Sequence, residues 1–136
     1  MIITDIEQID RIAEETFGTT KGIVSVDMKD YAFVKEHSES LKAIKVDIIE
    51  ISKSSVFAFE EALKEVCTEN VCNLLIYISG NGINSGAKTI TVEQMQFFHS
   101  SIEKNVSEDT CIIWGVGESC STNEGLTILI IAGNHK

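Results

Sequence analysis

The sequence predicts an α/β (α+β) domain, a two-layer sandwich in which helices pack on a mixed four-stranded sheet. Three short apolar runs, at residues 73–80, 111–116 and 126–132, have the length and glycine boundaries of strands rather than helices. The first run is apolar at nearly every position, which is typical of a strand buried on both faces. Segments with helical periodicity flank all three runs, so the sheet is expected to carry the fold.

Size and charge limit the classes of function. The 136 residues fit one domain, and 43% hydrophobic with 24% charged residues is ordinary for a globular chain. The formal net charge of −10 argues against nucleic acid and against an anionic membrane surface, because both require clustered basic residues. No apolar run has the length of a membrane span and the N-terminus shows no basic leader, so a cytoplasmic location is expected.

The first helix is expected to begin at Thr4, because Thr4-Asp5-Ile6-Glu7 has the pattern of a capping box with Thr4 as its N-cap. Apolar residues then recur at helical spacing on one face: Ile6, Ile9, Ala13 and Phe17. The opposite face is polar and includes Asp10, and Gly18 is the natural stop. This amphipathic helix and its linker occupy residues 1–21, and residues 22–136 form the predicted domain.

Residues 22–31, GIVSVDMKDY, predict a short strand that runs into an acidic turn and then a helix. Asp27 and Asp30 fall at the N-terminal end of that helix. Carboxylates there interact well with the free N–H groups and with the helix dipole. Helix capping is therefore the structural explanation for both aspartates.

The later elements follow from the same periodicities. A strand is expected from Leu41 to Ile51, with a phase slip at Ile49 that is typical of a bulge. Two further helices carry apolar stripes, at Val56, Phe59, Ala62, Leu63 and Val66 and at Val92, Met95, Phe98 and Ile102. The last two strands are separated by a short polar turn at residues 118–125, which predicts an antiparallel hairpin.

GIVSVDMKDY resembles the loop at the domain junction of bacterial FtsZ, the tubulin-like cell-division GTPase, whose pattern is close to G-L-I-N-x-D-F-A-D-V. Ser25 stands where that family usually has Asn, and Asp27 and Asp30 match its two acidic positions. Three further segments resemble strands of that family in the same order: NLLIYISGNG, CIIWGVGES and LTILIIAGN. The resemblance covers residues 22–134 but only the C-terminal half of FtsZ, so a fold like that of its C-terminal domain is implied.

In that family the loop enters the nucleotide pocket of the next subunit, and its carboxylates position the attacking water. The resemblance therefore implies a non-catalytic interaction module that docks on or caps a tubulin-like GTPase in cell division or filament regulation. Ser25, Asp27 and Asp30 are the implied contacts, with Asp30 as the water-positioning carboxylate. The G-G-G-T-G-T-G signature of the nucleotide-binding half is absent from the sequence, so no catalysis is expected beyond stimulation of a partner's hydrolysis.

The remaining motifs point to no independent chemistry. In the loop Gly80 to Thr89, Ala87 separates Gly86 from Lys88, so the P-loop pattern fails and no nucleotide is expected there. The cysteines form no CxxC pair and the histidines are poorly placed for zinc, so we expect no metal and no cofactor. His37 and His99 fall on predicted helices without a paired nucleophile.

An alternative from another class is a small-ligand-binding or self-assembling homo-oligomer. Under this interpretation the aspartates are only helix caps, and a symmetric oligomer buries the uncovered face of the sheet. A pocket between protomers, lined by Asn81, Glu118, Ser119 and Ser121, would indicate this function. A third interpretation is that the sequence is one piece of a longer protein.

Overall fold

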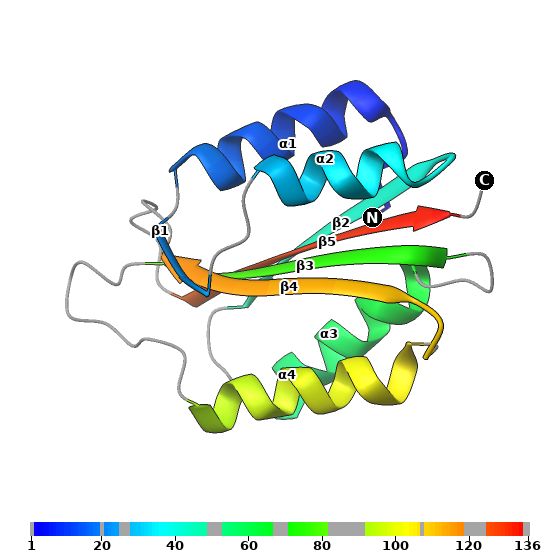
Figure 1. Ribbon diagram of the computed structural model, residues 1–136. Helices are drawn as coiled ribbons and strands as arrows, with labels where there is room; N and C mark the ends of the chain where they lie inside the picture. Colours follow the sequence, from blue (N-terminus) through cyan, green and yellow to red (C-terminus); the bar gives the residue numbers. More distant parts are fainter. Residues whose placement is uncertain are drawn as a thin grey trace.

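The computed structural model describes residues 2–19, 21–24, 28–48, 53–66, 71–81, 92–106, 108–118 and 125–134. Its elements follow the predicted order (Figure 1). They are α1 (Ile6–Thr19), β1 (Lys21–Val24), α2 (Met28–Glu36), β2 (Leu41–Ile48), α3 (Lys53–Val66), β3 (Val71–Asn81), α4 (Val92–Asn105), β4 (Cys111–Glu118) and β5 (Gly125–Asn134). The predicted bulge at Ile49 lies outside the described residues.

The described strands form one mixed sheet in the order β1-β4-β3-β5-β2, so the α/β class and the mixed sheet are confirmed. The four long strands are those expected from the sequence, and the short β1 joins them as an edge strand. β3 is parallel to β4 and antiparallel to β5. β2 runs antiparallel to β5, and β1 runs antiparallel to β4.

The predicted hairpin between the last two strands is wrong, because β3 lies between them. The physical reason is the composition of β5, which is apolar on both faces. Ile128 and Ile130 face one core, while Leu129 and Ile131 face the other. A strand of this kind buries more apolar surface between two neighbours in the middle of a sheet than beside β4 at its margin.

Helices cover both faces of the sheet, so the predicted two-layer arrangement is wrong and the domain has three layers (Figure 1). α1 and α2 pack on one face, and α3 and α4 pack on the other. The alternation of β3 explains this, because Leu74, Ile76 and Ile78 face α3 and α4 while Leu75 and Tyr77 face α1 and α2. The uncovered sheet face on which the oligomer alternative relied is therefore not present in the described part of the chain.

The layer formed by α3 and α4 confirms the predicted apolar stripes where their side chains are described; those of Val56, Val92 and Met95 lie outside the described residues. Its buried residues are Phe59, Ala62, Leu63 and Val66 on α3 and Phe98 and Ile102 on α4. The rings of Phe59 and Phe98 meet edge to face, with their centroids 5.1 Å apart. The two helices are also joined by a hydrogen bond of 3.0 Å that the Ser101 hydroxyl donates to Glu60 Oε1.

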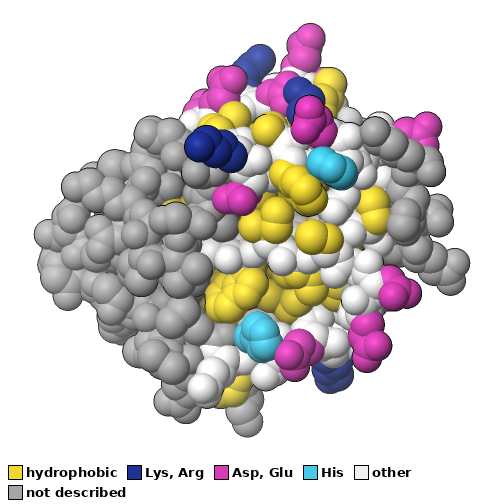
Figure 2. Space-filling model, in the orientation of Figure 1, with side chains coloured by type: hydrophobic (Ala, Val, Ile, Leu, Met, Phe, Trp, Pro, Cys, Tyr) yellow, Lys and Arg dark blue, Asp and Glu magenta, His cyan; other side chains and the backbone are white. Residues whose placement is uncertain are grey.

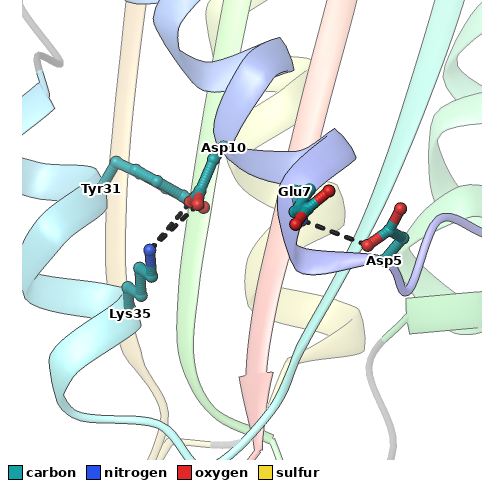
Figure 3. A network of polar contacts seen from close by, with 5 residues as sticks. All are labelled: Asp5, Glu7, Asp10, Tyr31 and Lys35. Carbon is teal, nitrogen blue, oxygen red and sulfur yellow. Dashed lines mark hydrogen bonds and ion pairs between the residues drawn. The ribbon is translucent and has the colours of Figure 1, made fainter.

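The N-cap of α1 is Asp5 rather than the predicted Thr4. The helix begins at Ile6, and the Asp5 carboxylate accepts a hydrogen bond of 3.2 Å from the backbone N–H of Glu7 (Figure 3). Both residue types cap well, so composition alone did not separate the two positions. On the same helix Ile9 and Ala13 are fully buried, while Ile6 is 41% exposed.

The N-terminal helix packs on the same sheet as the rest of the domain, because Ile9 and Ala13 share a core with residues of α2, β2, β3 and β5. The division between residues 1–21 and 22–136 stays a prediction. Among the described residues, no helix combines the length and the apolar composition that crossing a membrane requires.

Candidate functional site

Of the three predicted contact residues, the structure places Asp30 and not the other two. Asp30 lies in the first turn of α2, as predicted, and is partly exposed. It already makes an interaction within the chain, so the capping explanation stays open for it. Ser25 and Asp27 lie outside the described residues, and their roles stay predictions.

The segment before the site is held by the edge of the sheet. β1 pairs with the last residues of β4, in the register Lys21 with Glu118, Gly22 with Gly117 and Val24 with Val116. The register shifts between Gly22 and Val24, so the ladder is irregular just before the chain leaves the sheet. α2 then begins at Met28, after residues 25–27, which lie outside the described ones.

α2 is joined to α1 by a small polar network that includes Lys35 in the last turn of α2 (Figure 3). The Tyr31 hydroxyl donates a hydrogen bond of 2.5 Å to Asp10 Oδ1. Lys35 Nζ lies 3.0 Å from the same oxygen and 3.1 Å from Asp10 Oδ2. Tyr31 and Lys35 stand four residues apart, so they share one face of α2 and meet Asp10 together.

The network sets the protonation of its members. The hydrogen bond from Tyr31 is the main cause that lowers the pKa of Asp10; partial desolvation opposes it, and the contact with Lys35 adds a further lowering. Burial and the hydrogen bond to the Asp10 carboxylate raise the pKa of Tyr31 well above its ordinary value. Near neutral pH the carboxylate is therefore ionised and the phenol is protonated, which is the arrangement that the hydrogen bond requires.

This arrangement fixes the backbone next to the candidate carboxylate. Tyr31 follows Asp30 directly and is only 2% exposed, and Val34 one turn later is fully buried. Asp30 therefore projects from a helix start whose neighbouring turn is packed in the core. A carboxylate on such a support can accept hydrogen bonds from a partner, or orient a water molecule, with little loss of backbone freedom.

The residues of the alternative pocket are only partly placed. The backbone of Glu118 at the end of β4 lies opposite Gly80 of β3, one residue before Asn81. Ser119 and Ser121 lie outside the described residues, as does most of the glycine-containing loop after β3. In the described part of the chain, no group of three or more His, Cys, Asp and Glu side chains is arranged to hold a metal ion.

Sequence reasoning missed the role of Asp10 and Lys35. The periodicity of the first helix places Asp10 on its polar face, which predicts contact with solvent rather than with α2. The available signal was the spacing of Tyr31 and Lys35 on one face of a predicted helix, which places a phenol beside a cation. The identity of their acidic partner depends on how α1 and α2 pack, and periodicity does not give that.

Among known proteins, no family model and no curated protein matches the chain, whereas solved structures with a similar fold do. An FtsZ dimer from M. jannaschii matches with a TM-score of 0.58 and 14% identity, over 84% of this chain and 32% of that one. A TubZ protofilament in its GTPγS form, from Bacillus thuringiensis serovar israelensis, matches with a TM-score of 0.58 and 13% identity. The match covers 97% of this chain and 40% of that one. A four-stranded TubZ-Bt filament matches with a TM-score of 0.59 and 14% identity, over 96% of this chain and 32% of that one.

These identities are too low to show more than a shared fold. The chain spans about a third to two fifths of the solved structures that it matches. The neighbours are FtsZ and TubZ proteins, and they support the fold expected from the motifs at residues 22–134. The chain has the fold of one part of an FtsZ- or TubZ-like protein.

Proposed function

We propose that this chain is a non-catalytic module that docks on a tubulin-like GTPase and thereby regulates its filaments. The observation that carries the proposal is the asymmetry of the structural match. Between 84% and 98% of this chain superposes on only 32% to 42% of FtsZ and TubZ chains. A module with the fold of part of a filament subunit offers that part's contact surface to the same kind of partner.

In this proposal the matched part is the C-terminal half, as the order of the motifs indicates. The contact is the segment from Ser25 to Asp30, which faces the nucleotide pocket of the partner. The setting of Asp30 supports this role, because the carboxylate is partly exposed on a helix start held by the packed Tyr31. Asp30 would orient the attacking water, Asp27 would support it, and the partner would supply the nucleotide.

Docking of this kind acts at one end of a filament in the cytoplasm. A module that occupies the terminal nucleotide pocket blocks the addition of the next subunit. Because each filament has few ends, the module is expected to reduce polymer at concentrations well below that of the GTPase. Sequestration of free subunits would instead need equal amounts of the two proteins.

The test uses purified FtsZ from the same organism, with polymer measured by sedimentation and GTP hydrolysis by phosphate release. We expect the full chain to reduce pelleted FtsZ at substoichiometric concentration, or to raise turnover per FtsZ. If both quantities stay unchanged up to equimolar protein, the proposal is wrong.

Two matched variants of α2 distinguish a specific contact of Asp30 with the partner from a general effect of the negative charge of the chain. Asp30→Asn removes the carboxylate in the first turn of α2, and it should leave the fold intact because a charge near a helix N-terminus contributes only about 0.3 to 1 kcal/mol. Glu36→Gln removes the same charge at the other end of the helix, where Glu36 is exposed. Only Asp30→Asn should abolish the effect on turnover. Equal behaviour of the two variants would contradict a role for Asp30 in the partner's pocket.

A further inference from the structure

The two edges of the sheet differ in how they are protected. β2, at one edge, forms an additional bridge in which Ile3 and Ala43 exchange backbone hydrogen bonds of 2.7 and 2.8 Å. Its sequence also carries Lys42, Lys45 and Asp47. Charged residues on an edge strand discourage pairing with another strand, because pairing would remove them from water.

The opposite edge lacks these features along more than half of β4. β1 covers β4 only from Val116 to Glu118. From Cys111 to Gly115, β4 pairs with β3 on one side and with no other described strand on the other. Gly115 is buried, so the accessible part of this edge is Cys111–Trp114. This part reads Cys-Ile-Ile-Trp and carries no charge, in a chain whose net charge is −10. An open, uncharged edge strand offers backbone donors and acceptors to a further strand.

Apolar side chains surround this open edge on both sides of the sheet. Ile112 is 36% exposed, and Ile113 and Trp114 are partly buried against the two cores. The His99 ring lies 5.9 Å from that of Trp114. Figure 2 views the molecule from the β4 side and shows hydrophobic side chains gathered across the middle of this face, between the two helix layers. The open edge is thus continuous with an exposed apolar surface.

We propose that the edge at Ile112–Trp114 is a homodimer contact, in which β4 pairs antiparallel with β4 of a second copy about a two-fold axis at Ile113. A symmetric pair of identical strands must be antiparallel. For these three residues to pair, the axis must pass through the central one. The dimer would then join two sheets edge to edge. This inference does not depend on the proposed contact with a GTPase.

The side chains of the stretch are self-complementary in this register. Ile112 would lie opposite Trp114 of the second copy, and Trp114 would lie opposite its Ile112, both on the face covered by α3 and α4. Aromatic and β-branched residues make favourable cross-strand pairs. On the other face Ile113 would meet its own counterpart.

Charge favours a second copy at this edge over one at β2. The three paired positions hold no charged residue, so the pairing places no like charges opposite each other. A second copy at β2 would bring two sets of Lys42, Lys45 and Asp47 to one seam. The β4 contact is short, so we expect the weak, reversible association typical of small interfaces.

The first test is sedimentation equilibrium of the full chain in a concentration series that reaches the millimolar range. We expect a monomer–dimer equilibrium, with Ile112→Lys raising the dissociation constant by about tenfold or more because two cross-strand pairs are lost. Ile112→Thr, which keeps the β-branch and adds no charge, is the matched control and should change the dissociation constant less. A chain that stays monomeric throughout, or a dimer that Ile112→Lys leaves unchanged, would overturn the proposal.

The second test fixes the register by cross-linking in a Cys111→Ser background. Directly opposite residues have Cα atoms about 4.5 to 5.5 Å apart, within the range of a disulfide, so Ile113→Cys should form a covalent dimer on mild oxidation. In the Ile112→Cys dimer the two introduced cysteines would lie two residues apart along the paired strands, with about 8 Å between their Cα atoms. This variant should therefore form no disulfide. Circular dichroism of both variants checks folding. Equal cross-linking by the two variants would show that the dimer uses another contact.

Discussion

The side-chain amide of Asn73, at the start of the central strand, donates a hydrogen bond of 3.1 Å to the backbone carbonyl of His37, just beyond α2. The same nitrogen lies 3.2 Å from Ser38 Oγ, and both Asn73 and Ser38 are buried. The contact fixes the end of the helix that begins with the candidate carboxylate Asp30. Its loss would loosen α2 at the end opposite to that carboxylate.

We expect Asn73→Ala to lower the free energy of unfolding by about 1 to 3 kcal/mol, because it leaves buried acceptors without a donor. Urea unfolding followed by circular dichroism measures the change. Asn105→Ala is a suitable control, since the Asn105 amide donates to Ser101 O within a single helix. If Asn105→Ala lowers the free energy of unfolding as much as Asn73→Ala does, the hydrogen bonds between β3 and the end of α2 stabilise the fold no more than a bond within one helix.

Much of this architecture follows from local sequence, and the pairing of strands does not. The unbroken apolar run of β3 and the stripes of α3 and α4 identify buried elements because periodicity and burial are local properties. The position of β5 beside β3 depends on which distant strand offers the larger buried surface, and the short polar turn before β5 misled the prediction. The three layers depend likewise on where the helices cross over.

The candidate site divides in the same way. The resemblance at residues 22–31 located Asp30 at a helix start, which the structure shows. The partnership of Asp10 with Tyr31 required the packing of α1 on α2, since these two residues are far apart in sequence. The open edge of β4 could not be found without the strand order, because a buried central strand and an exposed edge strand share the same apolar composition.

Gly133 should tolerate no side chain. A Cβ atom at this position would lie 1.9 Å from Ser38 Oγ and 2.7 Å from Ser38 Cβ. We expect Gly133→Ala to cost about 1 to 3 kcal/mol of unfolding free energy, as overpacking of a dense core does. Ser38→Gly removes the obstructing atoms, so the double variant should be more stable than the sum of the single changes predicts. Strict additivity in denaturant unfolding would contradict the clash.

The N-cap of α1 distinguishes two adjacent residues. Asp5→Ala removes the acceptor for the Glu7 N–H and should lower the unfolding free energy by about 1 kcal/mol. Thr4→Ala, the neighbouring change, should alter it by only a few tenths of a kcal/mol, as at ordinary surface positions. Thermal unfolding of the two variants under identical conditions checks this. A larger loss for Thr4→Ala would restore the capping box that the sequence suggested.

Tyr31→Phe should weaken the contact between α1 and α2 near neutral pH and have less effect in acid. The pKa of Asp10 is lowered from 3.8 in the folded chain, chiefly by the Tyr31 hydroxyl, so its carboxylate stabilises the fold above that value. This contribution is lost as the pH falls through the lowered pKa. We expect a difference of about 1 kcal/mol between wild type and variant at pH 7, shrinking below about pH 4. Urea unfolding at pH 7 and pH 3 measures it, and a constant difference would contradict the mechanism.

The same pair predicts the opposite slope in alkali. The pKa of Tyr31 is raised above 10.0 in the folded chain by burial and by the Asp10 carboxylate. Above pH 10 the phenol therefore ionises in the unfolded chain while it stays protonated in the fold, so the unfolded state binds fewer protons and stability falls as the pH rises. Between pH 9 and pH 11 the wild type should lose about 1 kcal/mol more than Tyr31→Phe, which has no phenol at this position. Denaturant unfolding at both pH values gives the comparison, because the other titrating groups are common to the two proteins and cancel. Parallel losses in the two proteins would show that the Tyr31 hydroxyl is not held by Asp10.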